Sequence, residues 1–103
     1  MYRGSTPVYT IHMDGLQFSD LANLQITFTQ DHQIMIEKSL SEMTVDTEAN
    51  TASFSLTQEE TMQLKVGTVD KQIRLMNGEG AVTLTRIFRE KVEPNIREDL
   101  ING

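Results

Sequence analysis

The sequence of 103 residues contains no cysteine and no tryptophan, and only two prolines. The lack of cysteine excludes disulfides, thiolate zinc sites and thiol nucleophiles. No apolar run approaches the roughly 18 residues of a membrane helix, and the opening segment 1–7 lacks the apolar stretch of a signal peptide. We therefore expect a single domain that is made in the cytoplasm and is held together by its own core or by neighbouring subunits.

A surplus of basic residues is also missing. Nine Lys and Arg stand against fifteen Asp and Glu, for a net charge of −6. Binding nucleic acid requires a concentrated basic face, and the nearest basic cluster, at Arg86, Arg89 and Lys91, is interrupted by Glu90. We expect no nucleic-acid partner and no membrane partner.

Short runs of alternating apolar and polar residues extend along the chain, for example 9–13, 24–28 and 52–56. Period-2 alternation places every second side chain on one face of a strand, and strands separated by turns at this spacing indicate an antiparallel sandwich or barrel. We predict seven strands, at about 8–13, 24–30, 33–38, 43–45, 51–56, 68–76 and 81–92. The expected core consists of Ile11, Ile26, Phe28, Ile34, Ile36, Val45, Phe54, Leu56, Ile73 and Leu75.

The alternation is interrupted near 58–65, where a short helix is expected. Thr57 and Glu60 form the capping-box pattern, and Gly67 should end the helix. Lys71 is a mismatch on the inward stripe of the next strand, and a change of parity near Arg86 indicates a bulge in the last one. The prediction is one domain over 1–103, with a C-terminal tail at 93–103.

Charged residues on the last two predicted strands have two interpretations. Arg74 and Arg86 face outward, where they could bind an acidic partner or pair across the strands with Asp70 or Glu90. We expect the cross-strand pairing.

No catalytic or metal-binding pattern is complete. Asp46, Glu48 and Asn50 match the first ligand positions of a calcium loop, but the glycine and the bidentate glutamate of that loop are missing, so a hairpin loop is expected. His12 and His32 lie on separate elements and are expected to be solvated. We predict a protein that is not an enzyme and has no catalytic residue, cofactor, metal or small-molecule substrate.

Several segments together resemble a family of small proteins encoded by prophages of Gram-positive gut bacteria. The matching segments are 2–7 (YRGSTP), 26–30 (ITFTQ), 36–38 (IEK), 56–61 (LTQEET), 72–75 (QIRL) and, loosely, 92–101. These proteins are similar to the immunoglobulin-like N-terminal module of phage baseplate upper proteins. The resemblance implies an immunoglobulin-like β-sandwich and a tail- or baseplate-associated assembly subunit. It further implies other phage structural proteins as partners, with location in the host cytoplasm during assembly and then in the virion.

The two terminal segments are the predicted partner contacts, because apolar residues outside the core tend to mark docking surface. The residues are Tyr2, Arg3, Ile96, Leu100 and Ile101. A tail that folds back over its own sandwich is the alternative for the C-terminal segment. The alternative function is a free-standing immunoglobulin-like module that recognises a host or cell-surface protein or glycan.

Overall fold

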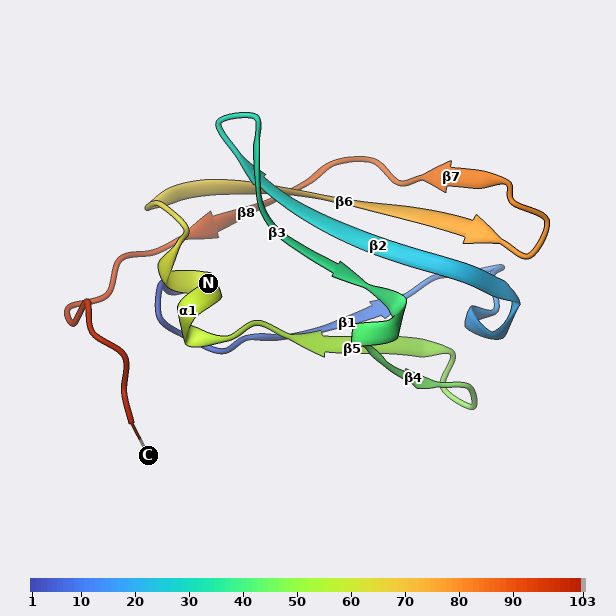
Figure 1. Cartoon of the computed structure of the whole chain (residues 1–103), viewed down its shortest axis with the longest axis horizontal. Helices are drawn as coiled ribbons and strands as arrows, with labels where there is room; N and C mark the ends of the chain where they lie inside the picture. Colours follow the sequence, from blue (N-terminus) through green and yellow to red (C-terminus); the bar gives the residue numbers. More distant parts are fainter. Residues whose placement is uncertain (103) are drawn as a thin grey trace.

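Two antiparallel sheets face each other in the structure, a computed structural model that describes residues 1–102 (Figure 1). The smaller sheet has the order β1-β5-β4, and the larger has the order β3-β2-β6-β7, with β8 also paired to β6. The strands are β1 (Val8–His12), β2 (Leu21–Gln30), β3 (Gln33–Ser39), β4 (Thr44–Asp46), β5 (Thr51–Ser55), β6 (Gly67–Asn77), β7 (Val82–Leu84) and β8 (Phe88–Val92). The short helix α1 (Gln58–Met62) and two 3₁₀ turns, at Phe18–Asp20 and Leu40–Glu42, complete the fold. The predicted all-β, immunoglobulin-like antiparallel sandwich with one short helix is confirmed.

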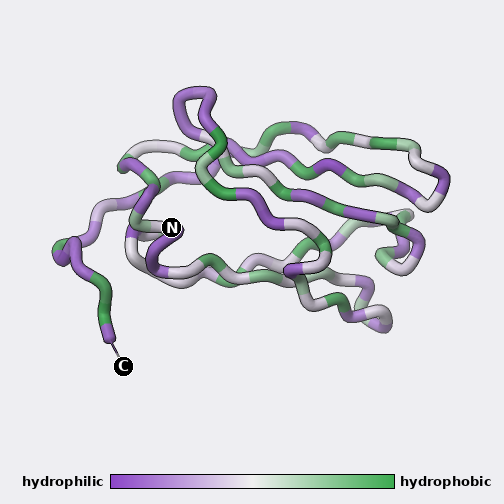
Figure 2. The backbone as a smooth tube through the Cα atoms, viewed as in Figure 1, coloured by the Kyte–Doolittle hydropathy of each residue, from purple (hydrophilic) through white to green (hydrophobic). Residues whose placement is uncertain are grey.

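The core lies between the sheets, as the alternation of hydropathy along the strands indicates (Figure 2). At its centre three aromatic rings contact one another. Phe28 lies edge-on to Tyr9 and Phe54, with ring centroids 5.7 Å and 6.4 Å away, and Tyr9 stacks on Phe54 at 5.4 Å. Such pairs stabilise a core beyond the area they bury.

Most of the expected core residues are buried, namely Ile11, Ile26, Phe28, Ile36, Phe54, Leu56 and Ile73. The prediction is wrong for Ile34, because a bulge between Phe28 and Thr29 shifts the register of β2 and β3 and places Ile34 opposite Thr29. Ile34 is consequently 66% exposed on the outer face. Val45 is also exposed, on the edge strand β4, and Leu75 is only partly buried.

The last predicted strand is divided into β7 and β8, which makes eight strands in place of seven. The interruption falls at residues 85–87, where a bulge near Arg86 was expected. Here Thr85 takes over the pairing with β6: its backbone N–H donates to the Ile73 carbonyl at 3.0 Å, and its hydroxyl accepts from the Ile73 N–H at 3.1 Å. Both short strands therefore follow one edge of β6, with a gap between them.

Helix α1 begins at the predicted capping box. The Glu60 N–H donates to the Thr57 hydroxyl at 3.1 Å, and the Thr57 N–H donates to the Glu60 carboxylate at 2.9 Å. The helix ends at Met62, earlier than predicted, and Leu64 just beyond it is the residue that becomes fully buried.

Replacing Thr57 by alanine removes one half of this box, and we expect it to lower the free energy of unfolding by about 1 kcal/mol. Urea denaturation followed by circular dichroism measures the change. Thr47→Ala, in an exposed turn, is the matched control. Equal stability of the two variants would contradict the capping role.

Candidate functional site

A groove of about 660 Å³ opens between the two sheets on the side where β1 faces β6 and β8. The buried side chains of Ile11, Ile26 and Ile73 line it from both sheets. Phe88 and Met13 lie at its rim. It is thus a largely apolar opening that reaches the core.

Two features of the strand arrangement produce this groove. β1 is an edge strand of the smaller sheet, because it pairs only with β5 among the described residues. On the opposite sheet, the gap between β7 and β8 leaves Ile73 without a complete neighbouring strand. The sandwich is therefore left uncovered along this side, and an edge strand with unpaired backbone groups borders the opening.

A polar network adjoins the apolar lining. The Lys71 ammonium donates to Glu90 at 2.9 Å, and the Tyr9 hydroxyl donates to the same carboxylate at 2.8 Å. The ammonium of Lys71 also lies 4.9 Å from the centre of the Tyr9 ring. Because Lys71 and Tyr9 both line the groove, a cation and a hydroxyl are held among apolar side chains.

The network changes the titration of its members. Burial raises the pKa of Tyr9, and the hydrogen bond to Glu90 raises it further. Burial also acts to raise the pKa of Glu90, but the hydrogen bonds from Lys71 and Tyr9 outweigh it and hold that pKa below its usual range. Glu90 is thus an anion at neutral pH, which keeps Lys71 in place.

A second hollow, of about 540 Å³, lies on the outer face of the larger sheet. The exposed side chains of Ile34, Leu84 and Ile87 border it, and polar residues such as Thr29 and Gln72 also line it. Its lining combines several short polar side chains with apolar ones.

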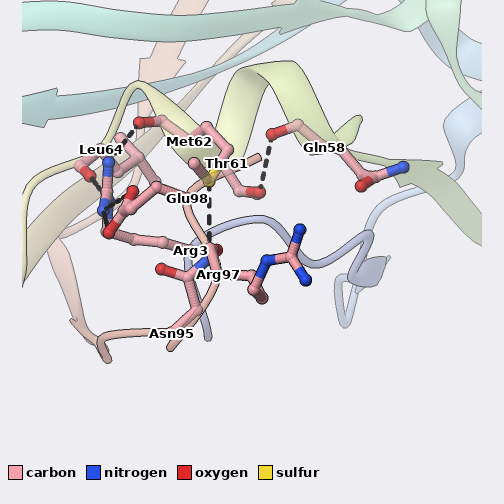
Figure 3. A network of polar contacts seen from close by, with 8 residues as sticks. All are labelled: Arg3, Gln58, Thr61, Met62, Leu64, Asn95, Arg97 and Glu98. Atoms are coloured by element: carbon pink, nitrogen blue, oxygen red, sulfur yellow. Dashed lines mark hydrogen bonds and ion pairs between the residues drawn. The ribbon is translucent and has the colours of Figure 1, made fainter. Parts of the chain in front are cut away.

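The structure places Tyr2 and Arg3, two of the predicted partner contacts, beside the C-terminal tail. Arg3 donates from Nε to the Leu64 carbonyl at 2.7 Å and from Nη2 to the Met62 carbonyl at 2.9 Å (Figure 3). Its Nη1 donates to both carboxylate oxygens of Glu98, at 2.8 Å and 2.7 Å. Arg3 therefore satisfies carbonyls at the end of α1 and binds the tail, whereas Tyr2 is exposed.

The predicted contacts in the tail itself stay at the surface. Ile96 is 99% exposed and Ile101 is 78% exposed, while Leu100 is 39% exposed. The Gln58 side chain pairs with the backbone of Ile101, donating at 3.0 Å and accepting at 2.9 Å. The tail is attached to α1 by polar contacts alone at these positions, and its partner-binding role stays a prediction.

The side chains weighed as metal ligands have other roles. Asp46 accepts from the backbone N–H groups of Glu48 and Ala49 at 3.1 Å each, which closes the expected hairpin loop. Asn50 accepts from the Phe18 N–H at 3.0 Å. Within residues 1–102, no group of three or more His, Asp or Glu side chains is arranged to hold a metal ion. In the same part of the chain, none of the helices has the length and apolar character that a membrane crossing requires.

The groove was not predicted from the sequence, but one of its lining residues, Lys71, was identified as irregular. Lys71 stood out as a cation on an inward stripe, and the structure accounts for it through Glu90 and Tyr9. The gap at residues 85–87 could be foreseen as an irregularity, but not the opening that it leaves between the sheets.

Comparison with known proteins supports the β-sandwich fold and does not identify a function. No family model and no curated protein matches the sequence. Among solved structures, the chain is similar to CopC from Methylosinus trichosporium OB3b, with a TM-score of 0.53 and 13% identity over 93% of this chain and 85% of that one. At this identity the likeness supports the β-sandwich fold alone.

The predicted function as a phage tail or baseplate subunit is wrong by this comparison. The matching structure comes from Methylosinus trichosporium and not from a phage, and no match of any kind supports a phage role. The alternative, recognition of a host protein or glycan, gains no support either. Of the aromatic side chains, Tyr9, Phe28 and Phe54 pack on one another, whereas Tyr2 and Phe88 are exposed. The resemblance to the prophage family stays an expectation.

Proposed function

We propose that the protein is a non-catalytic peptide-binding module that takes an extended peptide into the groove between β1 and β8. The observation that carries this proposal is the groove itself: an apolar opening into the core, bordered by an edge strand. An extended segment can add to such an edge through its backbone while alternate side chains fill the pocket.

The lining favours a peptide of particular composition. Ile11, Ile73 and Phe88 offer apolar contact, so apolar side chains should alternate along the peptide. Lys71 and Arg89 lie among them, beside the acid Asp14, and they are held by ion pairs with Glu90 and Asp70. A peptide with apolar residues four apart and a carboxylate midway between them, all on one side of the extended chain, is complementary to this surface.

The polar network supports a binding role over a catalytic one. Tyr9 and Lys71 both donate to Glu90, so these titratable groups already satisfy one another. Breaking this network for chemistry would leave a partly buried charge unpaired, which is costly.

Selection from a random-peptide display library tests the proposal. Bound peptides should share the apolar–x–acidic–x–apolar pattern, and in NMR spectra the shifted backbone amides should be those of β1 and residues 85–89. Phe88→Glu places an acid at the rim and should weaken binding by about tenfold or more.

Ile34→Glu is the matched control, because it makes a comparable change on the outer face of the same sheet. It should bind the selected peptides as the unmodified protein does. Shifts confined to the surface around Ile34 and Leu84, or normal binding by Phe88→Glu, would overturn the proposal.

A further inference from the structure

The groove and the exposed tail complement each other within one sequence. We propose that the peptide that fills the groove is segment 96–101 of a second copy of this chain, so that the protein associates head to tail. This inference rests on the proposed peptide-binding function and names its occupant.

The segment has the pattern that the groove requires. In an extended conformation Ile96, Glu98 and Leu100 point to the same side, because strand side chains alternate. That side then presents apolar, acidic and apolar groups in order. The groove offers Ile11 and Ile73 for the apolar groups, and the Lys71 ammonium, which keeps its bond to Glu90, has further N–H donors for the acid.

The charges are also complementary. The chain as a whole carries a net charge of −6, and the groove lining holds Lys71 and Arg89 beside one acid, Asp14. Each cation also has an acid partner next to the groove, since Glu90 lies 2.9 Å from the Lys71 ammonium and Asp70 lies 2.9 Å from Arg89 Nε. The segment holds Glu98 and Asp99 against one base, Arg97, and its acids would share the two cations with Glu90 and Asp70, which limits the repulsion between two copies of this protein.

In the structure the segment is held in a way that permits its release. Its contacts are polar and exposed: Glu98 with Arg3, Ile101 with Gln58, and Arg97 with Asp99 inside the segment. Exposed ion pairs contribute little to stability. Ile96 is 99% exposed where it lies, so transfer into an apolar groove would stabilise it, and Leu100, which is 39% exposed, would gain less.

The two surfaces lie at different places on the molecule. The tail leaves the sandwich at the end where α1 lies, on the left of Figure 1, whereas the groove follows β1 toward its far end. A single contact between them joins two different surfaces of two copies. Such contacts build rings or open chains, or close a symmetric dimer where two copies exchange their tails.

Sedimentation of the full chain over a range of concentrations tests the proposal. The average mass of the unmodified protein should increase with concentration, to that of a dimer where two copies exchange tails and beyond it where they associate head to tail. Phe88→Glu in the groove should weaken association by about tenfold or more, and so should Ile96→Ser combined with Leu100→Ser in the tail. Ile34→Glu should associate as the unmodified protein does. Circular dichroism spectra establish that each variant is folded.

A mixing experiment identifies the contact. The groove variant retains an intact tail and the tail variant retains an intact groove, so an equimolar mixture should form a one-to-one dimer and nothing larger. A mixture that stays monomeric, unmodified protein that is monomeric throughout, or tail variants that associate normally would each overturn the inference. If association is absent while library peptides still bind the groove, the occupant is wrong and the proposed function stands. If neither self-association nor peptide binding is observed, both the inference and the proposed function are overturned.

Discussion

Replacing Phe54 by alanine is expected to lower the free energy of unfolding by about 3–5 kcal/mol. Phe54 is only 5% exposed; it stacks on Tyr9 of the same sheet and contacts Phe28 of the other sheet edge-on. Removing the ring leaves a cavity at the centre of a small core, where the surrounding strands cannot close it completely. Urea denaturation followed by circular dichroism gives the free energy.

The matched control is Val8→Ala, because Val8 is an apolar residue of the paired strand β1 but is 71% exposed. Its free energy of unfolding should stay within about 0.5 kcal/mol of the unmodified value. A loss below about 1 kcal/mol for Phe54→Ala would show that this ring is not part of a packed core.

The strands and the central core follow from local sequence pattern. Phe28 and Phe54 alternate with polar neighbours, and a period of two is enough to assign them to inward faces. Ile34 was misassigned because pattern alone does not show where a ladder is interrupted. The bulge that moves Ile34 outward leaves Met35 without a partner in the ladder, and Met35 packs against the core.

Some buried residues had no periodic signal at all. Phe18 lies in a 3₁₀ turn, where it is buried because Asn50, from a distant loop, accepts from its backbone N–H at 3.0 Å. Leu64 follows α1 and is buried where the Gln30 side chain of β2 holds the backbone of Lys65, donating to its carbonyl and accepting from its N–H, both at 2.9 Å. Such burial depends on contacts between segments far apart in the sequence.

The sequence predicted which acids form ion pairs across the strands, but not which bases they pair with. Asp70 and Glu90 were expected to pair across strands with Arg74 or Arg86. The structure pairs Asp70 with Arg89 at 2.9 Å and Glu90 with Lys71 at 2.9 Å. The gap between β7 and β8 shifts the register by one residue, so Glu90 lies opposite Val69, where continuous pairing would place it opposite Thr68.

This register also connects the groove to the stability of the fold. The same gap that opens the apolar lining brings Glu90 opposite Val69 and next to Lys71 and Tyr9. Through Tyr9, Lys71 and Glu90, the network links β1 of the smaller sheet to β6 and β8 of the larger one. A change to Glu90 should affect the fold at the groove before it affects the distant strands.

Replacing Glu90 by glutamine is expected to lower the free energy of unfolding by about 1–3 kcal/mol at neutral pH. The amide oxygen can still accept from the Tyr9 hydroxyl, but the charge opposite Lys71 is lost. Lys71 has only 16% of its side chain exposed, so its ammonium would be left without its anion in a partly buried place.

The difference in free energy of unfolding between the unmodified protein and Glu90→Gln should depend on pH. The pKa of Glu90 in the folded state lies below its usual range, so its stabilising contribution is complete above the unfolded pKa of about 4.3 and is lost as the pH falls through the folded pKa. The unmodified protein should therefore lose this advantage over Glu90→Gln in acid. Urea denaturation at a series of pH values measures this difference in free energy.

Glu48→Gln, which changes an exposed carboxylate in a turn, controls for the loss of one negative charge. Its stability should follow that of the unmodified protein at each pH, since no partly buried cation depends on it. If the difference in free energy of unfolding between Glu90→Gln and the unmodified protein stays constant from neutral to acid pH, the charge of Glu90 does not stabilise the fold. In that case Lys71 would be held by its contact with the Tyr9 ring alone, and the cation proposed to receive an acidic peptide would be free to leave the groove.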